Sequence, residues 1–228
     1  MVGYVLRDPH LMNQMSLLAI CEGMIRVRDN AAELLEDARL LRENGRVSRA
    51  YTLAYMACEE YGKLSILIGV AVKMVVGIPV AWKATRKRFN SHNSKASQFV
   101  ALARTIPLIL EAAASGSKTV NTEELMIKAS VGVLFGPTMF SMRNASIYCD
   151  FVDNSFVGPS EQINESMADQ IIGYAQTHLA TASRLIVGTP EDLAQWLKSS
   201  YSRERYDKMM AFAAEASESL ANAFQKST

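Results

Sequence analysis

Cysteine, proline and histidine are all scarce in this chain, and charge of neither sign predominates. The 228 residues include three cysteines, six prolines and three histidines, and 24 lysines and arginines nearly balance 23 aspartates and glutamates. An odd number of cysteines, each within an apolar pattern, argues against a disulfide framework and favours free thiols in a reducing compartment. The net charge of +1 excludes a strong overall field, so any binding of nucleic acid must depend on a local patch.

Long apolar runs are also missing. The most hydrophobic segment is Leu64–Trp82, but Lys73 interrupts it, and Gly77 with Pro79 breaks it before it is long enough to span a membrane. The first residues, MVGYVLRDPHLMNQ, lack the basic start and the continuous apolar core of a signal peptide. We therefore expect a cytoplasmic protein with no membrane partner, in which Leu64–Trp82 contributes to the core.

Apolar residues recur at helical spacing through nearly the whole sequence, and no stretch shows the sustained alternation of a strand. The pattern predicts an all-α bundle. The segment 82–95, WKATRKRFNSHNSK, is expected to be a basic connector, and DNSFVGPSEQ a loop. The expected helices cover about 11–28, 29–44, 47–76, 94–114, 122–135, 139–151, 161–187, 190–199 and 203–225.

Glu60 occupies an unexpected position in the third of these helices. At the rotation of about 100° per residue of an α-helix, it falls near the centre of an arc that holds Leu53, Ala57, Leu64, Leu67 and Ala71. An ionised carboxylate that faces a core costs several kcal/mol unless a cation or several donors meet it. Glu60 therefore predicts a partner, and its loss would destabilise the fold by roughly 3 kcal/mol if that partner is a buried arginine.

Arg143 is the best candidate for that partner. It is a lone cation in the apolar segment MFSMRNASIYCDF, where Asn144 and Tyr148 stand four residues apart on one predicted helix face. A cluster of arginine, asparagine, tyrosine and a distant glutamate could hold a phosphate or organise a helix interface. Glu59 and Lys63 are expected to pair along their helix, either at the solvated surface or within a site.

A second polar cluster lies in the basic connector. Five cationic or potentially cationic residues and one aromatic residue, Phe89, stand within ten residues of the sequence; the five are Arg86, Lys87, Arg88, His92 and Lys95. Cations bind phosphates and exposed bases stack on aromatic rings, so the segment suits RNA or another acidic partner. The alternative is a solvated linker between two helices.

Three signatures in order resemble those of the AbiV-type abortive-infection proteins, a branch of the HEPN superfamily. They are NAAELLEDARLLRENGRVSRAYTLAYMACEEYGKL, RFNSHNSKASQF and MRNASIYCDF. The resemblance covers about 30–151, and its most specific part runs from Gly45 to Lys63. It implies a single up-and-down helical bundle with an HEPN-like core over 11–151 and additional C-terminal helices over 160–228. It also implies a homodimer and, in many HEPN proteins, a metal-independent endoribonuclease.

The catalytic signature of the superfamily is an arginine, a polar residue and, a few residues later, a histidine. Arg143 and Asn144 match its first two positions, but Tyr148 stands at the last. A tyrosine with an ordinary pKa of about 10 is a poor base at neutral pH, whereas histidine suits both proton transfers of RNA cleavage. His92 could supply the missing imidazole, with Glu60 orienting Arg143.

Three functions remain open at this point. The first is a ribonuclease toxin that needs no cofactor or metal and uses Arg143 with His92 or Tyr148. The second is a non-catalytic defence module that arrests growth by binding a phage-encoded protein or the translation machinery. The third uses Glu59, Glu60 and His92 as metal ligands, although the Glu-x-x-His spacing of di-iron bundles is missing.

Overall fold

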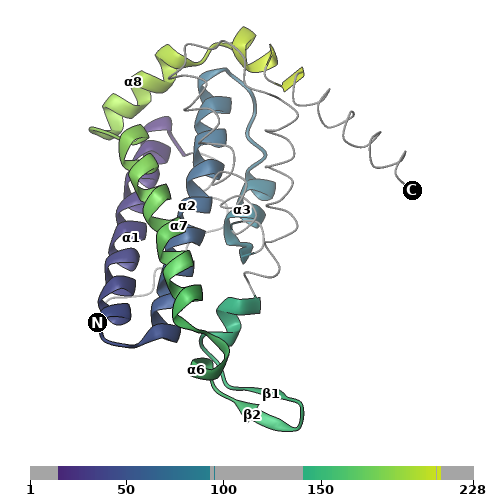
Figure 1. Cartoon of the computed structure of the whole chain (residues 1–228). Coiled ribbons are helices and arrows are strands. Elements are labelled where there is room, and N and C mark those ends of the chain that lie inside the picture. The colour runs from purple at the N-terminus through teal and green to yellow at the C-terminus, as the bar shows by residue number, and fades with distance from the viewer. Residues whose placement is uncertain (1–14, 93–94, 96–140, 209, 212–228) are drawn as a thin grey trace, which may run out of the picture.

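Two long helices joined by a tight turn form the base of the fold. The computed structural model describes residues 15–92, 95, 141–208 and 210–211. α1 covers Leu17–Glu43 and α2 covers Val47–Val75, and the two pack side by side along their length (Figure 1). In the turn between them Gly45 has a φ of +71°, a conformation that glycine adopts without steric penalty.

α1 corrects one prediction. Separate helices over 11–28 and 29–44 were expected, with Asp29 or Asn30 beginning the second, but α1 continues through both residues. Its buried residues recur at helical spacing on both sides of this point, from Ile20 and Met24 to Leu35 and Ala38. Asp29 and Asn30 are exposed, so their side chains face water without ending the helix.

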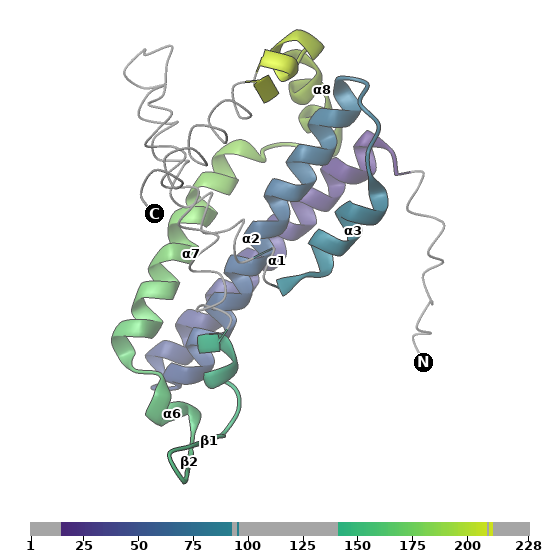
Figure 2. The same cartoon turned by 90° about the vertical axis from the view of Figure 1, so that its right-hand side faces the viewer.

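α2 is the central helix of the bundle. It packs against α1 and α7 (Glu165–Leu185) and is also in contact with α3 (Trp82–Asn90), and Figure 2 shows it between its neighbours. Its buried positions run from Ser48 to Val72 and cover most of its circumference, whereas Arg49 and Met56 on one stripe are exposed. A helix that is buried over so much of its surface is typical of the centre of a bundle.

α7 and α8 complete the described part of the bundle. α7 covers Glu165–Leu185 and packs on both α1 and α2, whereas α8 covers Pro190–Ser200 and packs mainly on α1. Arg42 near the end of α1 binds the first turn of α7, with its Nε 2.7 Å from Asp169 and its Nη2 2.8 Å from Glu165. The predicted all-α up-and-down bundle is confirmed.

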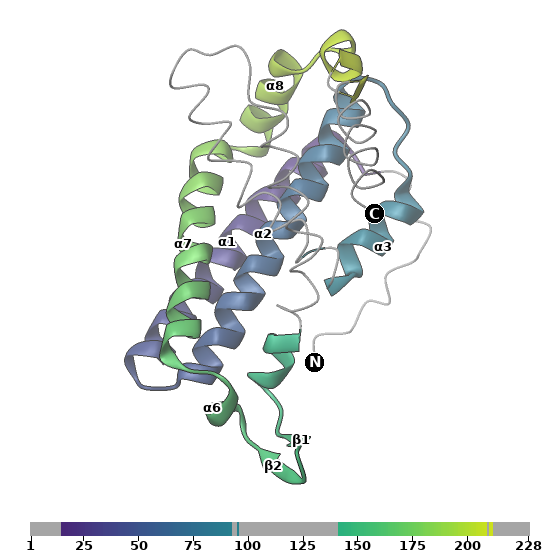
Figure 3. The same ribbon diagram turned by 45° about the vertical axis from the view of Figure 1, so that its right-hand side comes forward.

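Two segments that were expected to lack regular structure are ordered. The basic connector contains helix α3, Trp82–Asn90. The expected loop DNSFVGPSEQ and the end of the expected helix over 139–151 form a small antiparallel hairpin, β1 (Asp150–Val152) with β2 (Ser155–Val157), followed by the short helix α6 (Pro159–Gln162). Asp153 and Asn154 both have positive φ at the hairpin turn, which these residue types tolerate. The hairpin extends beyond the end of the bundle (Figure 3).

The expected helices over 94–114 and 122–135 lie almost entirely outside the described residues. Of the expected helix over 203–225, residues 203–208, 210 and 211 are described and are helical. None of the helices in the described part of the chain combines the length and hydrophobicity needed to cross a bilayer.

His178 of α7 is buried against α2. It is 6 % exposed, and its ring centroid lies 6.1 Å from that of Tyr61. Burial lowers the pKa of His178 from 6.5 to about 4, because the charged imidazolium is disfavoured away from water. The unfolded chain therefore binds a proton at this residue at a higher pH than the folded chain does.

Acid should destabilise the wild-type protein through His178. Between pH 6.5 and about pH 4 the free energy of unfolding should fall by up to about 3 kcal/mol more in the wild type than in His178→Leu. The measurement is urea denaturation of both proteins across this range. Parallel pH profiles would show that His178 is not held neutral by the fold.

Candidate functional site

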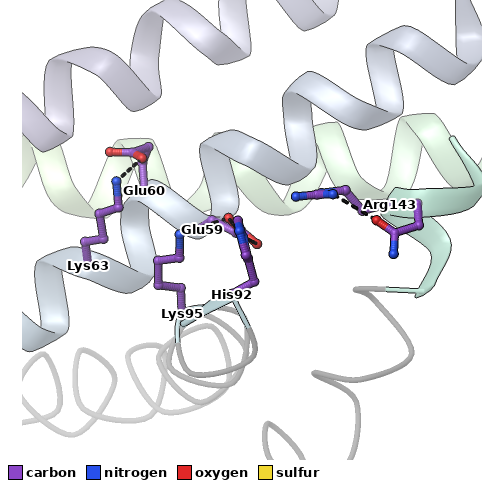
Figure 4. A network of polar contacts seen from close by, with 7 residues as sticks. Glu59, Glu60, Lys63, His92, Lys95 and Arg143 are labelled. Carbon is purple, nitrogen blue, oxygen red and sulfur yellow. Dashed lines mark hydrogen bonds and ion pairs between the residues drawn. The ribbon is translucent and has the colours of Figure 1, made fainter. Parts of the chain in front are cut away.

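Glu59 is the buried carboxylate of α2. Its side chain is only 7 % exposed, and both its oxygens face His92 Nδ1, at 2.8 Å and 2.9 Å. Lys95 Nζ lies 3.2 Å from Glu59 Oε2, and the Lys95 side chain is 9 % exposed. Figure 4 shows the three side chains converging on one point beside α2. Two potential cations from one segment thus meet the buried charge, as an ionised carboxylate away from water requires.

Gly62 allows the segment with His92 and Lys95 to approach α2. A Cβ atom at this position would lie 2.2 Å from the backbone oxygen of Lys95, far inside the contact distance. Because Gly62 is three residues after Glu59, it lies on the same helix face one turn further on. The absent side chain therefore brings Lys95 within reach of the carboxylate.

Glu60 has a different partner from the one expected. It forms an ion pair with Lys63, and the two side chains are 15 % and 18 % exposed. Lys63 Nζ also lies 5.2 Å from the centroid of the Phe89 ring on α3. The predicted pairs Glu60–Arg143 and Glu59–Lys63 are both wrong.

The physical reason for this error is the central place of α2. The prediction assumes that the apolar arc with Glu60 is the only face of α2 that is turned toward the core. The neighbouring face is buried as well, and it carries Thr52, Tyr55, Glu59 and Gly62 at three- and four-residue spacing. The segment with His92 and Lys95 covers one part of this face, and the segment with Arg143 covers another.

Arg143 lies in a helical turn over 141–145 that is fastened to α2. The Ser146 hydroxyl is 2.7 Å from Thr52 Oγ1, and Arg49 Nη1 donates to the Ile147 backbone oxygen at 3.2 Å. Arg143 Nη1 donates to Asn144 Oδ1 at 2.8 Å, so Asn144 helps to orient the guanidinium. In Figure 4 the Arg143 side chain extends from this segment toward the part of α2 that carries Glu59.

Tyr55 connects the two parts of the site electrostatically. Its ring is buried on α2, one turn before Glu59. Burial and the charge of Glu59 raise the pKa of Tyr55, and the charge of Arg143 acts in the opposite direction. Glu59 and Arg143 therefore both lie within electrostatic reach of one buried hydroxyl. Tyr55 is not among the site residues predicted from the sequence, although its spacing from Glu59 could have indicated it.

Three predicted site residues lie apart from this cluster. Tyr148 was expected on a helix face with Asn144, but the helix ends at residue 145 and Tyr148 is 60 % exposed in the turn that follows. Arg86 is half-buried and Arg88 is exposed, both on α3. Within the described residues, neither arginine has an ion pair with Glu59 or Glu60.

The described residues contain no group of three histidine, cysteine, aspartate or glutamate side chains that could hold a metal ion. Glu59 faces a histidine and a lysine, and Glu60 faces a lysine. What the geometry can provide is an imidazole held by a carboxylate, together with a guanidinium held by an amide. These are the parts needed to move a proton and to stabilise negative charge.

The close approach at Gly62 can be tested by adding one methyl group. Gly62→Ala should destabilise the protein by about 2 kcal/mol, since the backbone of Lys95 must move away from α2. Gly69→Ala is the matched control, because Gly69 is exposed on the same helix and its Cβ would have no neighbour within 4 Å. The control should be neutral or stabilising by up to about 1 kcal/mol. Equal thermal midpoints for the two variants would contradict the packing described.

The two adjacent glutamates should differ in their contribution to stability. Glu59→Ala removes the partner of the buried Lys95 charge and should destabilise by about 3 kcal/mol. Glu60→Ala breaks a less buried pair and should lower the free energy of unfolding by about 1 kcal/mol or less. Chemical denaturation of both variants measures the difference. If Glu60→Ala lowered the free energy of unfolding more than Glu59→Ala does, Glu60 and not Glu59 would be the buried carboxylate on which the fold depends.

Comparison with known proteins adds one match. The model of the HEPN_AbiV family, described as AbiV, matches residues 19–180, which is well over half of the chain. The match includes α1, α2 and α3 and extends into α7, beyond the region 30–151 that carries the resemblance in the sequence. No curated protein and no solved structure matches the chain.

Proposed function

Because the chain belongs to the AbiV family of HEPN proteins, we propose that it is an abortive-infection protein that acts against phage by cleaving RNA without a metal ion. The observation that supports this function best is the contact between Glu59 and His92 Nδ1, at 2.8 Å. The signature position of the missing histidine is occupied by Tyr148, and this contact gives His92 a defined place beside the site instead.

The reaction is attack of a ribose 2′-oxygen on the adjacent phosphorus. The bond from this oxygen to phosphorus forms, the bond from phosphorus to the 5′-oxygen breaks, and the proton of the 2′-hydroxyl is removed while the 5′-oxygen gains one. The products carry a 2′,3′-cyclic phosphate and a 5′-hydroxyl. No oxidant, cofactor or metal is required by this balance.

His92 exchanges the proton in this proposal. Glu59 accepts a hydrogen bond from Nδ1, which fixes the tautomer and orients the ring so that Nε2 is the nitrogen that acts on the substrate. The His92 side chain is 46 % exposed, so a strand in solution can reach it. Lys95 lies beside the buried carboxylate of Glu59 and offsets its negative charge.

Arg143 binds the reacting phosphate. A guanidinium presents several donors in a plane and stabilises the negative charge that develops on the phosphorus oxygens. Asn144 accepts from Arg143 Nη1 and restricts its orientation. We further propose a cytoplasmic homodimer as the active form, since the family resemblance implies a cleft between two subunits.

A second function is favoured by the hairpin. Phe151 and Phe156 pack edge to face across it with ring centroids 5.3 Å apart, yet they are 59 % and 81 % exposed. An aromatic pair in a hairpin that extends from the bundle suits contact with another protein. The alternative is therefore a non-catalytic module that arrests growth by binding a phage-encoded protein or the translation machinery.

Cleavage of RNA in the presence of EDTA tests the first function. Purified full-length protein should convert total RNA to fragments with 2′,3′-cyclic phosphate ends. His92→Ala and Arg143→Ala should each lower the rate at least about 100-fold, because they remove proton transfer and charge stabilisation. Tyr148→Phe is the control and should retain the wild-type rate, since the tyrosine hydroxyl has no part in the mechanism.

Three results would contradict the proposal. Cleavage that stops on addition of EDTA would require a metal ion, and full activity of His92→Ala would exclude its imidazole. Toxicity in cells without any cleavage of RNA would leave the binding function alone. Circular dichroism of each variant separates loss of activity from loss of the fold.

A further inference from the structure

We propose that the N-terminal end of α2 is a second phosphate-binding site, which holds a single-stranded RNA some nucleotides away from the bond to be cleaved. This inference rests on the proposed function and adds a site to it. A cavity of about 460 Å³ lies where the turn before α2 meets α6 and the start of α7. Arg46, Ser48 and Arg49 line it from the side of α2.

The first turn of α2 has backbone N–H groups without a hydrogen-bond acceptor among the described residues. Arg46 occupies the N-cap position without a side-chain hydrogen bond to the helix. Within the described residues, the backbone N–H groups of Val47, Ser48 and Arg49 have no hydrogen-bond acceptor. Such groups, together with the helix dipole, favour an anion.

Ser48 gives independent support for a ligand in the cavity. Ser48 lines the cavity and is only 8 % exposed. Its hydroxyl makes no hydrogen bond to any residue that the structure describes. The hydroxyl can therefore donate a hydrogen bond into the cavity, and a phosphate oxygen is an acceptor that suits it.

The charge around the cavity is positive. Arg46 is exposed and forms no ion pair with a described residue, and Arg49 donates to the neutral backbone oxygen of Ile147 rather than to a carboxylate. Glu165 also lines the cavity, and Arg42 lies 2.8 Å from it and offsets part of its charge, since Arg42 also pairs with Asp169. Two arginines and a helix N-terminus therefore face the space, against one paired carboxylate.

The position of the cavity fits a strand that also reaches Arg143. Arg49 donates to the backbone of Ile147, so the segment with Arg143 ends beside the cavity. From Arg49 to Glu59, α2 advances about 15 Å, a distance that a strand covers in roughly four nucleotides. Tyr148 follows Ile147 and is 60 % exposed, which offers a ring on which a base between the two sites can stack.

Binding of a non-cleavable RNA at several salt concentrations tests the second site. The probe is a labelled twelve-nucleotide RNA with 2′-O-methyl groups, measured by fluorescence anisotropy. Arg46→Ala should weaken binding several-fold and reduce the slope of log affinity against log salt by about 0.7, the value for one phosphate contact in a single strand. Ser48→Ala should weaken binding less and leave the slope unchanged, because it removes a neutral donor.

Length and charge controls make the test specific. A dinucleotide cannot span both sites, so the wild type should bind it much more weakly than it binds the twelve-nucleotide RNA. Lys198→Ala removes one exposed positive charge from α8, at the other end of the bundle from α6, and should behave as wild type with the longer RNA (Figure 1). A wild-type salt slope in Arg46→Ala, or an equal loss in Lys198→Ala, would overturn the second site.

The outcomes also separate this inference from the proposed function. Binding of the twelve-nucleotide RNA that is lost in Arg143→Ala and unchanged in Arg46→Ala would refute only the second site. A wild-type protein that binds neither RNA would refute the proposed function together with it.

Discussion

The buried charge of Glu59 is the constraint on which the arrangement of this protein depends. A carboxylate in the centre of a bundle is stable only if cations or donors come to it, and here they come from residues 92 and 95. That requirement fixes the path of the chain after α3, because His92 and Lys95 must both reach the same two oxygens. Gly62 makes the approach sterically feasible. The charge of Glu59 and the absence of a side chain at Gly62 therefore determine the position of His92, whose imidazole the proposed reaction uses.

α2 contributes residues to the candidate site as well as to the core. One of its faces carries Thr52, Glu59 and Gly62, and each of these binds or accommodates a segment that is distant in sequence. The same helix packs on α1 and α7 through its remaining faces. Because a buried helix of this kind cannot shift without disturbing all its neighbours, it is a rigid support for the polar groups. Rigidity of the support is what a site of positioned donors needs.

The sequence predicted the helical bundle well and the site less well. Periodic apolar residues located α2, α7 and α8 to within a few residues, because amphipathic spacing depends on neighbouring positions alone. The choice between Glu59 and Glu60 failed because the buried surface of α2 is wider than the single apolar stripe in the sequence, and Glu59 lies deeper in it than Glu60 does. The hairpin was missed because its short strands are exposed and do not alternate, and only the Asp153–Asn154 turn could have indicated it. The bond from Arg49 to the backbone of Ile147 leaves no trace in residue types at all.

The separation of the site residues along the chain has a consequence for synthesis. α1 and α2 are adjacent in sequence and pair through a short turn, so this hairpin of helices is complete once the first 75 residues have left the ribosome. Arg143 and the segment that fastens it to Thr52 are translated much later. A nascent or truncated chain thus carries Glu59 without Arg143, and the two polar groups of the candidate site come together only after translation has passed residue 143.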